Sequence, residues 1–287
     1  MERNEGLARV ISVALLLESF RLPGSEFRLS DTIRLRRCGE DELSALGRVD
    51  RFAVLDGQGL AALEGQFDSH EDTANLGHFR VLRRHVEKAA LALRLTFPGT
   101  LGWRMACFSW PQQGAYEVFP RRADYGSLNA LGEGEVQVSP RGLSQAAELW
   151  CKTKDVLLSL NGRPYLAVAL DRFSDSYARA NHLDKVLDLV ICVEALVPEG
   201  PGRGKGKRIA RLVAPLIVSE APHLRQSDAR QAVESLYETR NAVVHGENVK
   251  VDAGQVLSWK DRVRQCLRGY LEKTAAGAEP AWLERGM

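Results

Sequence analysis

Apolar residues recur every three or four positions through most of the second half of this 287-residue chain. This spacing places them on one face of an α-helix, and such a face has to pack against other apolar faces. The connections between the periodic segments are short, as they are in helical bundles. The pattern predicts helices over residues 144–160, 164–177, 182–197, 208–218, 227–245 and 255–274.

Residues 1–143 show a mixed pattern in which apolar residues partly alternate, as they do along strands. We expect strands over residues 8–19, 26–38, 102–110 and 114–120, and a helix over residues 78–96. The stretch 50–77 is rich in Gly, Asp and Ser and gives no clear prediction. The fold class is therefore α+β, with an N-terminal mixed α/β domain over residues 1–143 and a C-terminal all-α helical domain over residues 144–287.

The composition is that of an ordinary globular protein, with 45% hydrophobic and 26% charged residues. The formal net charge is +2, so any contact with nucleic acid has to come from a local basic patch. No apolar run is long enough to cross a membrane, and we expect no membrane partner. The five cysteines lie far apart without metal-ligand spacing. We therefore expect reduced thiols in a cytoplasmic protein, with no disulfide framework, metal site or cofactor.

The predicted helix 227–245 carries a charged residue on its apolar stripe. Arg240 follows Ala229, Val233 and Leu236 at helical spacing, where a hydrophobic residue is expected. Asn241 comes next, and His245 lies four residues beyond it, so these two side chains share a face of the helix. Gly246 then fits the left-handed position that follows many helix ends.

The predicted helix 182–197 shows the same anomaly, because Glu194 continues the apolar stripe of Leu187 and Val190. Opposite charges on the inner faces of two helices predict an ion pair between Glu194 and Arg240. A structural core pair is one interpretation, although such pairs contribute little net stability because desolvation offsets their attraction. A functional site is the other.

Several segments together resemble one family. The segments "SYARANHLDKVLDLVICVEALV", a basic loop, "RIARLVAPLI" and "LYETRNAVVHG" follow one another in that order. The arrangement Arg240-Asn241-x-x-x-His245 is similar to the R-x4-6-H motif of HEPN domains, and the order of segments resembles the Apea-like HEPN group. The resemblance covers roughly residues 144–275.

The resemblance implies a metal-independent endoribonuclease that acts as a homodimer, in defence, as a toxin or in a stress response. RNA would be the substrate, and a protein antitoxin or regulator would be a partner. Cleavage by the RNA 2′-hydroxyl needs a group that moves protons and a cation for the phosphorane charge. We expect His245 in the first role and Arg240 in the second. Asn241 would orient His245 or touch the sugar-phosphate, and Glu194 would hold Arg240.

The loop after residue 199 is basic. Residues 199–287 contain 15 Lys or Arg and 11 Asp or Glu, so we expect a local and salt-sensitive contact with RNA phosphates. The alternative interpretation is a solvated, flexible loop. The predicted RNA-binding residues are Arg203, Lys205, Lys207, Arg208 and Arg211.

Two other functions stay open. The first is a non-catalytic HEPN module for dimerisation and for binding RNA, a nucleotide or a protein. The second is a structural helical protein in which Glu194 and Arg240 are only a core pair. In the enzyme hypothesis, residues 1–143 sense or restrain the activity.

Overall fold

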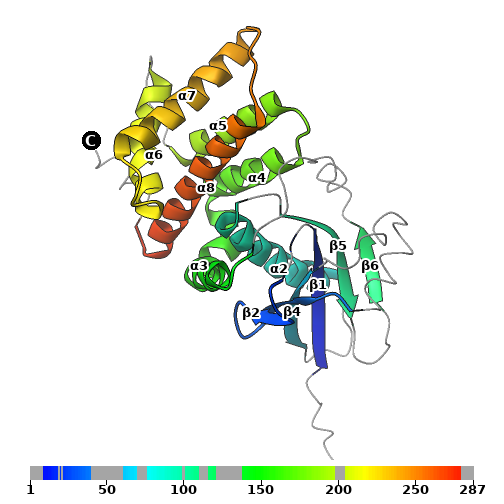
Figure 1. Ribbon diagram of the computed structural model, residues 1–287. Coiled ribbons are helices and arrows are strands. Elements are labelled where there is room, and N and C mark those ends of the chain that lie inside the picture. Colours follow the sequence, from blue (N-terminus) through cyan, green and yellow to red (C-terminus); the bar gives the residue numbers. More distant parts are fainter. Residues whose placement is uncertain are drawn as a thin grey trace, which may run out of the picture. The chain divides into compact units, whose positions relative to one another are not determined.

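A computed structural model of the chain describes residues 9–18, 20, 22–39, 61–69, 76–98, 101–109, 116–120, 138–197 and 204–278 (Figure 1). Their contacts form two compact units, and along the described chain the division falls between Lys154 and Asp155. The first unit contains a β-sheet and helices, whereas the described part of the second is helical. The predicted α+β fold class is confirmed.

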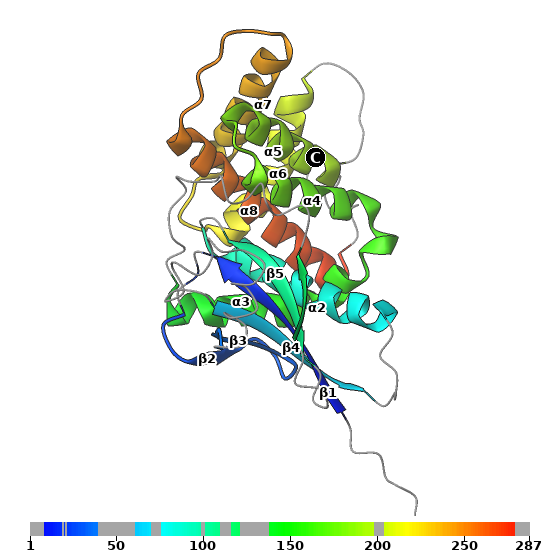
Figure 2. The ribbon, with the colours of Figure 1, turned by 90° about the vertical axis from the view of Figure 1, so that its right-hand side faces the viewer.

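The first unit is built on an antiparallel sheet in which the described strands follow the order β2-β3-β4-β1-β5-β6. Figure 2 shows the short β2–β3 hairpin beside β4. The strands are β1 (Arg9–Glu18), β2 (Glu26–Arg28), β3 (Ile33–Arg37), β4 (Ala61–Ser69), β5 (Gly102–Ser109) and β6 (Tyr116–Pro120). The expected strands over residues 8–19, 102–110 and 114–120 are confirmed.

Two parts of the sheet differ from the prediction. Residues 26–38, expected as one strand, form β2 and β3 with a tight turn between them. The backbone N–H groups of Leu29 and Ser30 both donate to the carbonyl oxygen of Ile33, at 2.9 and 3.1 Å. β4 lies in the stretch that gave no prediction. Its first residues, 61–63, are all buried, so they show none of the alternation that marks a half-buried strand.

Helix α2 (Leu76–Thr96) packs on β1 and β4 and so covers one face of the sheet. Val13 and Leu15 of β1 are fully buried, as are Val86 and Leu93 of α2, which lie seven residues apart on one face of the helix. This apolar layer is the core of the first unit. The expected helix over residues 78–96 is confirmed.

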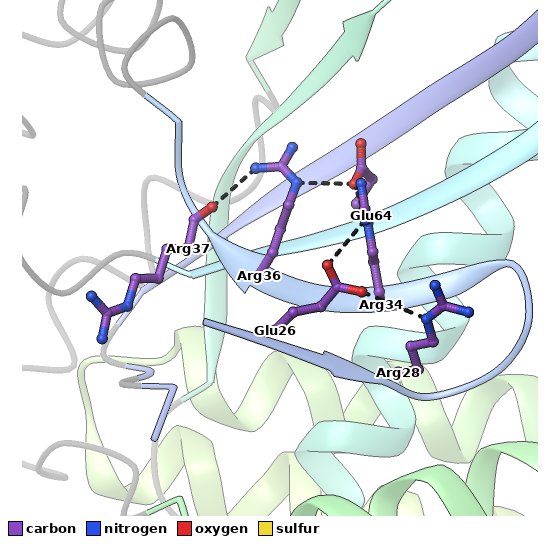
Figure 3. A network of polar contacts seen from close by, with 6 residues as sticks. All are labelled: Glu26, Arg28, Arg34, Arg36, Arg37 and Glu64. Atoms are coloured by element: carbon purple, nitrogen blue, oxygen red, sulfur yellow. Dashed lines mark hydrogen bonds and ion pairs between the residues drawn. The ribbon is translucent and has the colours of Figure 1, made fainter. Parts of the chain in front are cut away.

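Arginines and glutamates on β2, β3 and β4 form a polar network, which Figure 3 shows from close by. Glu64 of β4 is only 5% exposed. Its Oε2 atom accepts hydrogen bonds from Nε of Arg34 at 2.7 Å and from Nε of Arg36 at 2.9 Å. Glu26 accepts a bond from Nη1 of Arg34 at 3.1 Å and lies 3.6 Å from Nε of Arg28. A buried carboxylate is therefore neutralised by two neighbouring arginines of one strand.

The helices after residue 138 agree with the sequence pattern, and the predicted helical bundle is confirmed. Pro164 occupies the first helical turn of α4, as expected, because its missing N–H needs no partner there. The helices are α3 (Pro140–Leu158), the short 3-10 helix η3 (Leu160–Gly162), α4 (Pro164–Ala178), α5 (His182–Leu196), α6 (Lys205–Glu220), α7 (Gln226–Val244) and α8 (Ala253–Ala275).

In the second unit α4 pairs with α5, α6 packs against α7 and α8, and α5 also contacts α7 and α8. α6 and α8 approach each other closely at Gly269, where an added Cβ would lie 2.7 Å from the carbonyl oxygen of Leu216. Among the described helices, none is both long and apolar enough to span a membrane.

Candidate functional site

The carboxyl end of α7 carries the predicted motif. The buried residues of α7 end at Tyr237, and none of residues 238–244, all of which are described, is buried. Arg240 is half-buried, whereas Asn241 and His245 are exposed. The motif therefore lies where the helix leaves the apolar core, and its polar groups are open to a ligand.

The end of α7 is fixed by backbone hydrogen bonds. The N–H of His245 donates to the carbonyl oxygen of Asn241 at 2.9 Å. Gly246 has a φ of 76°, and its N–H donates to the carbonyl oxygen of Val243 at 3.1 Å. The N–H of Glu247 donates to the carbonyl oxygen of Ala242 at 2.9 Å. These paired bonds are the Schellman arrangement, which places a left-handed residue directly after the helix. The predicted role of Gly246 is confirmed, and the chain turns away directly after His245.

Asn241 contacts Arg240 and not the imidazole of His245. Nη1 of Arg240 donates a hydrogen bond of 3.1 Å to Oδ1 of Asn241. Only the backbone carbonyl of Asn241 reaches His245. Within the described part of the chain, the His245 side chain makes no hydrogen bond. Asn241 therefore positions the arginine, and the imidazole is left exposed.

The predicted ion pair between Glu194 and Arg240 is wrong, since no hydrogen bond or ion pair joins these two described residues. Instead, Nζ of Lys205 lies 2.8 Å from Oε1 of Glu194, and the hydroxyl of Tyr237 donates to the same oxygen. Arg240 acts on Glu194 only through its charge. The carboxylate thus joins α5 to the start of α6 and to the middle of α7.

The electrostatics of this contact follow from burial and charge. Burial favours the neutral form of Glu194, but hydrogen bonds from Lys205 and Tyr237, together with the charges of Lys205 and Arg240, outweigh it and lower its pKa. Burial and the bond to the Glu194 carboxylate raise the pKa of the Tyr237 hydroxyl, which therefore stays a donor. Glu194 is thus held in its charged form near neutral pH.

The local sequence explains how Lys205 reaches Glu194. Gly204 precedes α6 with a φ of 82°, and Lys205 is the first residue of the helix. Gly206 lies against the ring of Tyr237, where an added Cβ would be 2.9 Å from Cγ. Tyr237 is a residue of this contact that the sequence pattern alone did not indicate. Its signal was available, because a tyrosine in a helical core position needs a partner for its hydroxyl.

The predicted RNA-binding residues lie at the start of α6, apart from Arg203, which falls outside the described residues. Lys205 binds Glu194, and Lys207 and Arg211 are exposed. Arg208 is half-buried, and its charge acts on the Tyr237 hydroxyl. The structure thus brings three of the predicted cations around Glu194 and Tyr237. We call Lys205, Arg208 and Arg240 the basic cluster.

An open pocket of about 350 Å³ lies at the amino end of α5. Nδ1 of His182 lies 3.0 Å from the carbonyl oxygen of Val251 and ties the segment before α8 to α5. The motif residues Arg240 and His245 do not line this pocket, so it is not the predicted site. A search of the described residues for three or more grouped His, Cys, Asp or Glu side chains finds no candidate metal site.

Comparison of the chain with protein-family models, with curated proteins and with solved structures gave no match. The resemblance to HEPN domains therefore stays a prediction from the residues of the motif and the order of the helices. The function of the chain has to be inferred from the chemistry and geometry of the candidate site.

Proposed function

We propose that this chain is a metal-independent endoribonuclease of the HEPN type, with Arg240 and His245 as its central residues. One observation carries the proposal. A guanidinium and an imidazole both lie at the carboxyl end of α7, outside the apolar core, and a fixed backbone turn follows them. Neither side chain has a structural partner that accounts for its position, because Arg240 bonds only the neighbouring exposed Asn241 among the described residues.

The chemistry uses groups suited to neutral pH. An imidazole has an unperturbed pKa of about 6.5, so it takes up and releases protons readily. His245 removes the proton from a 2′-hydroxyl, whose oxygen attacks the adjacent phosphorus. The bond from phosphorus to the 5′-oxygen then breaks, and that oxygen takes up a proton. The products are a 2′,3′-cyclic phosphate and a 5′-hydroxyl. Arg240 binds the phosphate oxygens and stabilises the phosphorane charge.

The geometry of α7 favours a site made by two copies of the chain. α7 is regular through Val244, so side chains five residues apart, such as those of Arg240 and His245, point about 140° away from each other. Val244, next to His245, is 56% exposed although it is apolar. A second copy that covers Val244 brings its own motif to the same place, so we propose a homodimer around the carboxyl ends of α7.

The test is RNA cleavage in excess EDTA by the purified full chain, by His245→Ala and by Arg240→Ala. Two exposed residues offer matched controls, His223→Ala and Arg230→Ala, which remove the same side chains elsewhere in the second unit. We expect the parent and the controls to cleave, and both motif variants to lose about 100-fold or more in rate. Equal cleavage by the motif variants and their controls would refute the site assignment.

The divergence of Arg240 and His245 favours a second candidate function, a non-catalytic HEPN module that binds RNA, a nucleotide or a protein such as an antitoxin or regulator. Such a module binds RNA but does not cleave it at any protein concentration. A dimeric enzyme, in contrast, gains specific activity as the concentration rises through its dimerisation constant. Cleavage measured over a range of protein concentrations therefore separates the two functions.

A further inference from the structure

Glu194 is held in the basic cluster through one of its two carboxylate oxygens. Lys205 and Tyr237 both bind Oε1. Within the part of the chain that the structure describes, Oε2 has no hydrogen-bond partner. The Glu194 side chain is 21% exposed and that of Lys205 is 53% exposed. The contact is therefore open to solvent and only half of the carboxylate is used.

Cations outnumber the anion at this place. Lys205 and Arg240 both act on the single Glu194 carboxylate through their positive charges, and the charge of Arg208 acts on the Tyr237 hydroxyl that binds this carboxylate. Among the described contacts of Arg240, a single N–H donates a hydrogen bond, to Asn241. Lys207 and Arg211 add exposed positive charge along α6. Among the described residues, Lys205 and Arg240 thus carry more positive charge than the Glu194 carboxylate offsets, and Arg240 keeps unused donors.

We propose that the basic cluster is a phosphate-binding site that Glu194 occupies when no ligand is present, and that a phosphate group displaces Glu194 from Lys205. Carboxylate and phosphate oxygens accept hydrogen bonds from the same cationic donors, so the two anions compete. The proposal deepens the ribonuclease function and rests on it for the identity of the ligand, an RNA phosphodiester. A free phosphate or nucleotide offers the same chemistry.

The exchange has a low cost in the structure. The ion pair of Lys205 and Glu194 is only partly buried, so water competes for the Lys205 charge and weakens the pair. When Lys205 moves to a phosphate, Oε1 of Glu194 keeps the hydroxyl of Tyr237 as a donor. Lys205 then has the phosphate and Glu194 has Tyr237 as a partner, so the carboxylate lowers the affinity of the site for phosphate without blocking it.

The experiment measures binding and not cleavage, so failure of the ribonuclease function does not affect it. A fluorescent 2′-O-methyl oligoribonucleotide, which has no 2′-hydroxyl for attack, is titrated with the full chain at about 0.1 M ionic strength. Inorganic pyrophosphate serves as the competitor. Glu194→Gln is expected to bind the oligonucleotide about five- to tenfold more tightly, because a competing anion is lost. The control Glu272→Gln, near the carboxyl end of α8, makes the same change of charge and should alter affinity less than about twofold.

Two further variants isolate the contact. With Lys205→Gln already present, Glu194→Gln should gain less than about twofold, because the contested donor is gone. Tyr237→Phe changes no charge but removes the hydroxyl that stays with Glu194 when Lys205 moves away. Lys205 is then the one described donor to Glu194, so Glu194 should hold it more tightly and the oligonucleotide should bind more weakly. Tighter binding of the oligonucleotide alone assigns the site to phosphodiesters, and tighter binding of pyrophosphate as well assigns it to phosphate groups in general. Equal effects of Glu194→Gln and Glu272→Gln, or no loss in Tyr237→Phe, would overturn the proposal.

Discussion

Replacement of Glu64 by glutamine tests whether the polar network of the sheet stabilises the first unit. Glu64 is almost fully buried and accepts hydrogen bonds from Arg34 and Arg36 through one oxygen. Burial raises the pKa of Glu64, but the bonds and charges of Arg36 and Arg34 outweigh it, so the pKa is lowered on folding. Glu64→Gln keeps the shape of the side chain and removes the negative charge that Arg34 and Arg36 both contact.

The loss of stability expected for Glu64→Gln depends on how exposed its two arginine partners are. Removal of one partner from a fully buried ion pair costs about 3–5 kcal/mol. The Arg34 and Arg36 side chains keep 29% and 20% of their exposure, so water partly compensates their charges. We expect a loss of about 2 kcal/mol in the free energy of opening the sheet, which lies between the buried and exposed limits. Glu26→Gln, on the same network but 36% exposed at its side chain, should cost about 0.5 kcal/mol or less.

Amide hydrogen exchange of β3 and β4 is the assay, because it reports local opening even where the two units unfold separately. A loss of 2 kcal/mol corresponds to exchange about 30-fold faster in Glu64→Gln than in the parent. Because the folded pKa of Glu64 is lowered, its contribution is present above the unfolded value of about 4.3 and is lost as pH falls through the folded value. The difference in exchange rate between parent and Glu64→Gln should therefore disappear at low pH. A difference that stays constant with pH, or one equal to that caused by Glu26→Gln, would refute the reasoning.

Three further changes test the helical unit by urea unfolding. Gly246→Ala should lower the free energy of unfolding by about 1 kcal/mol, since its φ of 76° strains any L side chain. Gly162→Ala should have little effect, because an added Cβ at Gly162 meets nothing within 4 Å and its φ is not positive. Gly269→Ala should cost about 1–3 kcal/mol because its Cβ would lie 2.7 Å from the carbonyl oxygen of Leu216, and an unchanged stability would show that α6 and α8 separate freely. Asp252→Ala removes the capping box at the start of α8 and should cost about 1 kcal/mol, which Asp252→Asn should largely restore.

The sequence predicts the helices well because each helix repeats its apolar stripe over several turns. The bounds of α4, α5 and α7 all lie within about two residues of the predicted ones, the usual uncertainty of helix ends. Strands are harder. β2 and β3 merged into one predicted strand because buried Leu29 extends the alternation past the end of β2, and β4 begins with three buried residues that show no alternation.

The candidate site shows the limit of the same method. Periodicity indicates that Glu194 and Arg240 face inward, but not which residue of another helix lies opposite each of them. That depends on where α6 starts, and Gly204 and Gly206 set its first turn so that Lys205 reaches Glu194. The turn at Gly246 was predictable because it is encoded by adjacent residues.

The backbone turn after α7 fixes the backbone of His245 but not its imidazole ring. The position of the His245 backbone is set on folding by the bonds around Gly246, so in the proposed ribonuclease it adds no entropic cost to the binding of RNA. The exposed imidazole has no such restraint among the described residues, so a ligand has to restrict its rotation and lose that conformational entropy. In the proposed ribonuclease, any surface that packs beside Val244 and orders this ring reduces the entropic part of the activation barrier. Association with a second copy would then raise turnover per active site even if it supplied no chemical group of its own.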